Sequence, residues 1–215
     1  MEAALSTTPK LRFAVESAEA VRHAAAPTIA FGLAIESDRD VRSLMLQVQL
    51  RIAAPDRPYD AATQERLRDL FGPPADWGRT LRSLLWTHAT LLVPAFSGST
   101  TVDLEVPCTY DFEVAAAKYL HAVADGGVPL EFLFSGTLFY AAENGGLQTA
   151  RISWESEAPF RMPVSVWKDA VERAFPGTAW LRVHRDLFDR LAAYRSRRTL
   201  PTWDAVVEEL LEGRE

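Results

Sequence analysis

The segment Val128-Pro-Leu-Glu-Phe-Leu-Phe-Ser-Gly-Thr-Leu-Phe-Tyr140 decides the fold of this chain. It is rich in aromatic residues and glycine-containing turn signals stand on both sides of it, which is typical of a β-strand. Leu130 and Phe132 fall on one face of that strand, while Leu133 and Phe139 fall on the other. A strand that is apolar on both faces is normally covered on both faces. The segment therefore predicts a central strand with a second layer packed over it.

Earlier segments also alternate between apolar and other residues with the period of two that strands show. The segment that ends at Ile35 and the one that begins at Leu44 flank a turn at Ser37 to Asp40, which predicts that the two form an antiparallel pair. Pro107 lacks an N–H donor, so a bulge, an edge position or a switch between sheets is expected there. The predicted strands cover residues 11–15, 29–35, 44–52, 79–93 and 102–114, with a helix over residues 81–86 as the alternative for part of the fourth.

Helical periodicity appears in one insertion and again near the C-terminus. Asp60 can cap the inserted helix, and Gly72-Pro73-Pro74 can end it. Residues 147–154 are predicted to pair with the central strand through an Asn144-Gly145 turn. The segment from Trp154 to Pro163 contains prolines and is interpreted as a connector. The predicted helices cover residues 60–71, 115–123, 165–175 and 186–198, and a last helix follows the capping residue Thr202.

These patterns together predict an α+β protein with a mainly antiparallel, β-sandwich-like body and C-terminal α-helices packed on it. We expect a single domain over residues 1–215. Its β-rich body would occupy residues 1–154, and its helical part would occupy residues 155–215.

Composition and charge narrow the classes of protein to consider. The chain has 215 residues, of which 48% are hydrophobic and 24% charged, as in a folded globular protein. No apolar run approaches the roughly 20 residues of a membrane span. Residues 1–10 lack the pattern of a secretory signal, so a cytoplasmic location is expected. A net charge of −6 opposes binding to nucleic acid and to anionic membranes.

Catalytic and cofactor-binding motifs are absent from the sequence. There is no Gly-x-Ser-x-Gly elbow, no glycine-rich phosphate loop and no His-Glu-x-x-His motif. The single cysteine, Cys108, lies on the apolar face of its predicted strand, so a buried and unreactive thiol is expected. The opposite face, with Asp103, Glu105, Asp111 and Glu113, is interpreted as solvated. We therefore expect no catalytic residue, no metal ligand and no cofactor.

Aromatic and arginine residues near the C-terminus are the candidates for contact with a partner. Both residue types are enriched at protein interfaces. The alternatives are that the aromatic residues dock helices onto the sheet and that the arginines belong to a solvated face. The candidate partner-binding residues are Trp154, Phe160, Arg161, Trp167, Arg195 and Arg198.

The chain also resembles an uncharacterised bacterial family that is classed only as a domain of unknown function. The resemblance covers nearly the whole chain and rests on four features. These are residues 29–52, Pro107-Cys-Thr-Tyr-Asp-Phe-Glu-Val114, the Val128–Tyr140 segment, and Arg161-Met-Pro-Val-Ser-Val-Trp167 with the Thr202-Trp203-Asp204 ending. Members of that family are often encoded beside nickel–iron hydrogenase subunits and their maturation proteins. The resemblance thus implies an accessory or assembly role.

The leading functional hypothesis is a non-enzymatic protein that binds another protein. The resemblance implies that this partner is a hydrogenase subunit or a maturation factor. One alternative is an enzyme or small-ligand carrier with a pocket between sheet and helices, near His88, Tyr110 or Asp111. A further alternative is self-association through an exposed apolar patch.

Overall fold

The computed structural model describes residues 8–108, 114–142, 145–178 and 182–213. The chain divides into two compact units, Met1–Ala179 and Trp180–Glu215. We call the first unit the body and the second the hairpin unit, and we describe each by itself. The change of character predicted at residue 154 lies inside the body, because residues 157–174 continue it with a strand and a helix.

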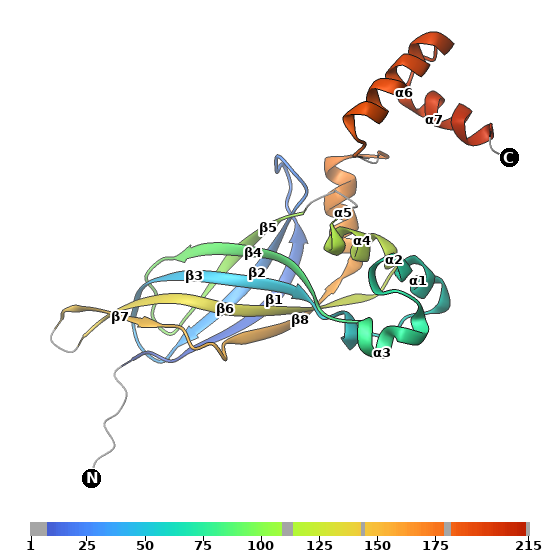
Figure 1. The fold of residues 1–215 in the computed structure, drawn as a ribbon. Helices are drawn as coiled ribbons and strands as arrows, with labels where there is room; N and C mark the ends of the chain where they lie inside the picture. The colour runs from blue at the N-terminus through green and yellow to red at the C-terminus, as the bar shows by residue number, and fades with distance from the viewer. Residues whose placement is uncertain (1–7, 109–113, 143–144, 179–181, 214–215) are drawn as a thin grey trace. The chain divides into compact units, whose positions relative to one another are not determined.

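The body is built around a five-stranded antiparallel sheet (Figure 1). Its central strand, β6, is the strand predicted from the Val128–Tyr140 segment. β3 runs along one side of β6, and β7 and β8 follow one another along the other side. The strands are β3 (Val41–Ile52), β4 (Leu84–Val93), β6 (Gly127–Ala141), β7 (Leu147–Arg151) and β8 (Glu157–Pro163), in the order β4-β3-β6-β7 with β8 also paired to β6.

Three predictions about this sheet need correction or completion. The strand predicted from Arg79 begins only at Leu84, because residues 77–80 form a short helix. The connector predicted between Trp154 and Pro163 contains β8, and its prolines are accommodated because β8 lies at the edge of the sheet. β7 pairs with β6 as predicted, although Asn144 of the predicted turn lies outside the described residues.

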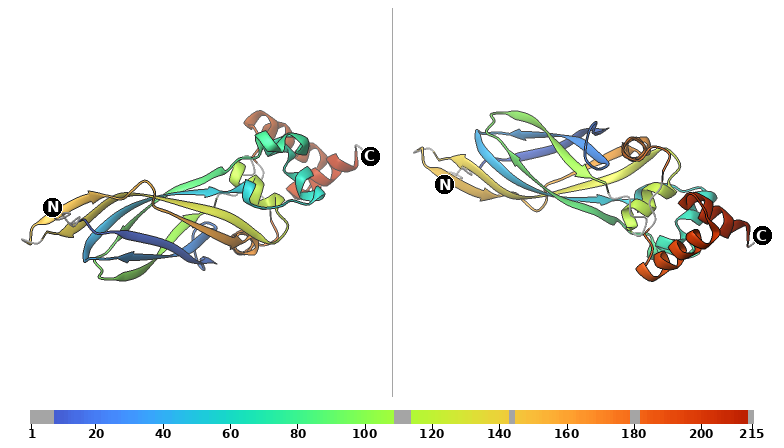
Figure 2. Two further views of the ribbon diagram at one scale, coloured as in Figure 1. Left: turned by 90° about the horizontal axis from the view of Figure 1, so that it is seen from below. Right: turned by 90° about the horizontal axis from the view of Figure 1, so that it is seen from above.

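A three-stranded antiparallel sheet forms the other layer of the sandwich (Figure 2). Its order is β1-β2-β5, with β1 (Leu11–Ala20), β2 (Thr28–Ser37) and β5 (Ser99–Pro107). The predicted pairing of residues 29–35 with 44–52 is therefore wrong, since β2 and β3 belong to different sheets. Both strands bury one face in the same core from opposite sides, and alternation alone cannot distinguish that arrangement from a hairpin. β5 lies at the edge of this sheet and ends at Pro107. Of the three alternatives expected for Pro107, the structure therefore shows the edge position.

The core lies between the two sheets. Phe132 meets Phe31 of the opposite sheet edge to face, with ring centroids 5.1 Å apart, and Phe134 stacks on Phe13 at 4.3 Å. The prediction that both faces of β6 are covered is wrong, because Leu133 and Phe139 on its second face are half-exposed. A two-layer sandwich covers only the inner face of each sheet.

Short helices gather at the end of the sandwich where β3 ends and β6 begins (Figures 1 and 2). Asp60 caps the first of them by accepting a hydrogen bond from the Thr63 N–H at 2.6 Å. The predicted helix over residues 60–71 is two helices that meet at Leu67. The elements are η1 (Ala54–Asp56), α1 (Ala61–Arg66), α2 (Arg68–Phe71), η2 (Pro74–Asp76), α3 (Trp77–Thr80) and α4 (Ala115–Ala122).

The remaining helices follow β8. α5 (Val164–Ala174) packs on β1, β2 and β8 of the body, with Trp167 buried beneath it. The hairpin unit contains α6 (Arg185–Arg198) and α7 (Trp203–Glu212), and Thr202 caps α7 as predicted. Thr199 ends α6 in the left-handed conformation. The α+β class with C-terminal helices is confirmed, and no helix in the described ranges is long and apolar enough to cross a membrane.

Gly136 allows β6 and β3 to approach one another, and its replacement tests the sheet. Its φ is +139°, and a Cβ atom there would lie 2.0 Å from the Met45 carbonyl oxygen. We expect Gly136→Ala to lower the free energy of unfolding by about 3 kcal/mol or more, because both strain and a backbone clash must be relieved. Urea unfolding followed by circular dichroism measures this loss.

Gly145→Ala is the matched control. Gly145 also has a positive φ, of +80°, but a Cβ atom there would meet nothing within 4 Å. The control should lose only about 1 kcal/mol. Equal losses in the two variants would show that the close approach to Met45 is unimportant.

Candidate functional site

The six candidate partner-binding residues fall in both units of the chain. Trp154 is 86% exposed in the connection between β7 and β8. Trp167 is only 3% exposed and packs in the core of the body, so it offers no surface to a partner. Phe160 and Arg161 lie on β8, whereas Arg195 and Arg198 lie on α6 of the hairpin unit. The structure therefore does not gather the six into one site.

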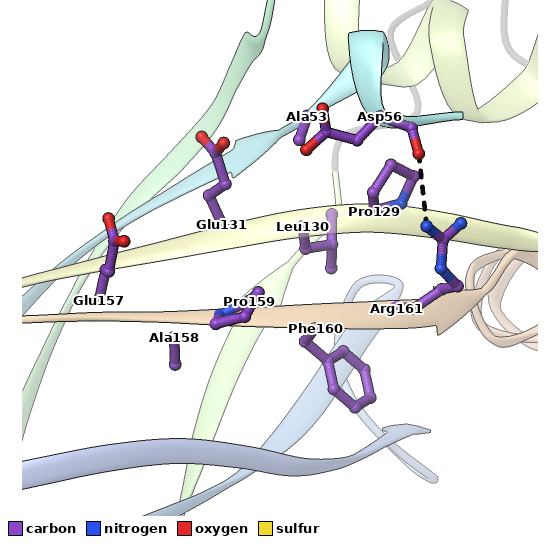
Figure 3. A pocket seen from close by; sticks show the side chains of 10 residues that line it. All are labelled: Ala53, Asp56, Pro129, Leu130, Glu131, Glu157, Ala158, Pro159, Phe160 and Arg161. Atoms are coloured by element: carbon purple, nitrogen blue, oxygen red, sulfur yellow. Dashed lines mark hydrogen bonds between the residues drawn. The ribbon is translucent and has the colours of Figure 1, made fainter. Parts of the chain in front are cut away.

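Phe160 and Arg161 point to opposite sides of β8 (Figure 3). Phe160 points toward the three-stranded sheet, where its ring lies edge to face with Phe31 at 6.2 Å. Arg161 points the other way and donates a hydrogen bond to the Asp56 carbonyl oxygen at 3.3 Å. Phe160 is thus part of the packing between layers, and Arg161 ties η1 to the edge of the sheet.

A pocket of about 340 Å³ lies over β6 and β8 and includes both of these residues in its lining (Figure 3). Its carboxylates, on Asp56, Glu131 and Glu157, outnumber its one cation, Arg161. The Glu131 carboxylate also lies 3.9 Å from the guanidinium of Arg51 on the neighbouring strand β3. Among the described residues, no three His, Cys, Asp or Glu side chains are grouped as metal ligands.

The residues proposed for an alternative ligand pocket are not brought together. His88 is exposed on β4, opposite Gln49 of β3. Tyr110 and Asp111 lie outside the described residues, as does the whole stretch 109–113 near the C-terminal end of the predicted strand.

Burial raises the pKa of one thiol and of two tyrosine hydroxyls in the body and so favours their neutral forms. Burial raises the pKa of the Cys108 thiol to about 12. Burial also raises the pKa of Tyr59 and of Tyr119, whose hydroxyl oxygens lie 2.7 Å apart at the helical end of the body. The Tyr59 hydroxyl donates to the Ala54 carbonyl oxygen at 2.6 Å, so Tyr119 must donate to Tyr59. This pair joins η1 to α4 and has the character of a packing contact.

The hairpin unit has little core of its own. Val206 is its one fully buried hydrophobic residue in the described part of the chain, with an exposed fraction of 0%. Phe188 and Trp203 touch one another, with ring centroids 5.4 Å apart, but both remain 40% exposed. The large apolar side chains left exposed, which we call the hairpin apolar face, are Leu187, Phe188, Trp203, Val207, Leu210 and Leu211.

Arg195 and Arg198 hold the hairpin together. Arg195 donates hydrogen bonds to the carbonyl oxygens of Leu200 (3.2 Å) and Pro201 (2.8 Å), and its guanidinium lies over the Trp203 ring at 5.0 Å. Arg198 donates to a Glu209 carboxylate oxygen at 2.7 Å and so joins α6 to α7. The two candidate arginines therefore make their contacts within the unit. The residues of the hairpin apolar face remain exposed beside them.

The outer face of the five-stranded sheet is a smaller competitor. Met45 and Leu92 lie opposite one another there and are exposed, Leu92 by 69%. They stand among polar neighbours such as Gln47 and Thr90. Scattered exposed apolar residues of this kind are ordinary on a protein surface, whereas the six residues of the hairpin apolar face belong to a single pair of helices.

Comparison with known proteins places the chain in a family. It belongs to DUF6084, a family of unknown function, whose model matches residues 8–215. The sequence matches no curated protein.

The similarities to solved structures are weak. A putative late embryogenesis abundant protein matches with 14% identity and a TM-score of 0.34, over 74% of this chain and 73% of its own. A β-glucosidase from Kluyveromyces marxianus matches with 9% identity and a TM-score of 0.26, over 72% of this chain and 15% of its own. Neither match carries an argument about fold or function.

The Cys108 thiol provides a test of the buried groups. We expect no reaction of the folded protein with a thiol reagent at pH 8, and stoichiometric reaction in urea, because a pKa of about 12 leaves almost no thiolate. Above pH 9 the unfolded chain loses this proton first, so the free energy of unfolding falls as the pH rises toward 12, by at most about 1.4 kcal/mol per pH unit.

Cys108→Ala is the control, because it should show a shallower fall in stability over the same pH range than the natural protein. Rapid labelling of the folded protein at pH 8, or identical alkaline slopes for the two proteins, would contradict burial of a neutral thiol.

Proposed function

We propose that this protein is a non-enzymatic accessory protein that binds another protein through the hairpin apolar face. The observation that carries the proposal is the ratio of covered to uncovered apolar residues. Within residues 182–213 of the unit, one hydrophobic residue, Val206, is fully buried, while six large ones are about 40% to 65% exposed.

The size of the hairpin unit strengthens this argument. Units below about 40 residues usually need a disulfide, a metal or association with another chain to be stable. The unit spans Trp180–Glu215 and contains no cysteine. Six half-exposed side chains of this size leave on the order of 500 Å² of apolar surface, which is at the upper end for a monomer and below the roughly 800 Å² that each partner contributes to a standard interface.

The charges around the face favour a partner with both signs of charge. α6 carries five arginines and two aspartates, whereas α7 carries four acidic residues and no basic one. A partner helix or groove would therefore place acidic residues beside α6 and basic residues beside α7. Such a rim orients the partner and speeds its association, while the apolar contacts supply affinity.

The finer part of the proposal concerns the identity of the partner. The resemblance to proteins encoded beside nickel–iron hydrogenase genes supports a bacterial, cytoplasmic role in hydrogenase assembly. We propose that a hydrogenase subunit or one of its maturation factors occupies the hairpin apolar face.

Affinity capture with charged substitutions on α7 tests the proposal. The tagged protein would be recovered from its native host under conditions where hydrogenase is made, and bound proteins would be identified by mass spectrometry. We expect Val207→Glu and Leu211→Glu each to reduce recovery of a specific partner about tenfold or more, because a charge in an apolar contact costs at least about 1.4 kcal/mol.

The matched control is Leu92→Glu on the outer face of the sheet, where the side chain is as exposed as Leu211. It should leave recovery unchanged, and thermal unfolding should show that all three variants are folded. Equal recovery with the α7 variants would contradict binding through the hairpin. Recovery of a partner unrelated to hydrogenase would leave the binding surface in place and reject its proposed identity.

A further inference from the structure

A second pocket of the body, of about 580 Å³, lies between the β1–β2 connection and α5. Arg22 and His23 line it from the connection, and Arg173 lines it from the helix. Ala170 and Ala174 provide small apolar surface along the helix side. The volume is within the roughly 300–1,000 Å³ of small-molecule sites.

The charged and titratable residues that line this pocket are two arginines and one histidine, and none is a carboxylate. Two other pockets of the body differ in this respect. The pocket over β6 and β8 combines three carboxylates with Arg161, and a pocket of about 470 Å³ combines Lys10 and Arg12 with Glu36 and Asp38. In a chain with a net charge of −6, a pocket lined by cations without carboxylates concentrates positive potential locally.

Neither Arg22 nor Arg173 forms an ion pair among the described residues. The Arg173 guanidinium donates one hydrogen bond, of 3.2 Å, to the Ala20 carbonyl oxygen, which orients it and leaves its other N–H groups available. The nearby Glu172 carboxylate instead accepts a hydrogen bond from the Gly177 N–H at 2.9 Å.

His23 lines the same pocket from an exposed turn of the β1–β2 connection, at a backbone position that suits glycine. Its φ is +63°, in the left-handed region that few non-glycine residues adopt. A glycine would take this conformation freely, yet the chain places an imidazole there. Left-handed non-glycine residues occur at turns and helix ends as well as at binding sites, and at each of these places the surrounding structure offsets the strain.

We infer that this pocket binds the oxyanion group, a phosphate or a carboxylate, of a small molecule. Guanidinium groups donate paired hydrogen bonds to the oxygens of either group, and the His23 ring supplies a further donor. The alanines accommodate a small apolar portion of the ligand. This inference is independent of the proposed binding of a partner protein, because the pocket lies wholly within the body.

Titration calorimetry of the full chain at low ionic strength tests the inference, with inorganic phosphate, pyrophosphate and citrate as separate probes. We expect at least one probe to bind, with a preference between the phosphates and the tricarboxylate that identifies the recognised group. Arg22→Gln should weaken that binding roughly tenfold, as expected for loss of a charged hydrogen bond. Arg12→Gln, in the charge-balanced pocket, should leave it unchanged.

His23→Gly separates a role in binding from a role in folding. Because glycine suits φ = +63°, the variant should unfold at the same or a higher temperature than the natural protein while binding the probe more weakly. Absence of binding by all three probes would overturn the inference. Equal weakening by Arg12→Gln and Arg22→Gln would also overturn it, because it would mean that the anion responds to overall charge and not to this pocket.

Discussion

The pairing of β3 with β6 is the contact on which the body depends. The register runs from Val41 opposite Tyr140 to Ile52 opposite Leu130, which joins the two longest strands along almost the whole of β3. Alternate residues of both strands enter the core, where Phe132 and Phe134 meet aromatic rings from β2 and β1. With this pairing in place, β4, β7 and β8 add to its sides, and the helical elements at one end cover the point where β3 leaves the sheet.

Much of the body could be predicted from periodicity and turn chemistry, but the assignment of strands to layers could not. The apolar and aromatic content of Val128–Tyr140 identified the central strand, and Asp60 and Thr202 marked helix starts because their caps are local interactions. Alternation in β2 and β3 fixed which side chains enter the core, yet it carries no information on which strand is the neighbour. β8 was missed because its prolines argue against a strand unless its edge position is already known.

The candidate site shows the same limit at the level of single residues. Residue type alone pointed to Arg195 and Arg198, but their hydrogen bonds are made within the hairpin unit. The apolar periodicity of α6 and α7 predicted the two helices correctly, but it could not say whether anything covers their apolar residues. The body has a large core, whereas the described part of the hairpin unit buries only Val206, and this contrast became visible only in three dimensions.

Amide hydrogen exchange of the protein without a partner tests most directly whether the hairpin unit lacks a core of its own. Protection reports the free energy of local opening, which follows burial. We expect amides of α6 and α7 to exchange at least about a hundredfold faster than those of β3 and β6. Binding of a partner should slow the exchange of the α6 and α7 amides. Amides of α6 and α7 as protected as those of β6 in the free protein would contradict it, since the hairpin would then be stable without a partner.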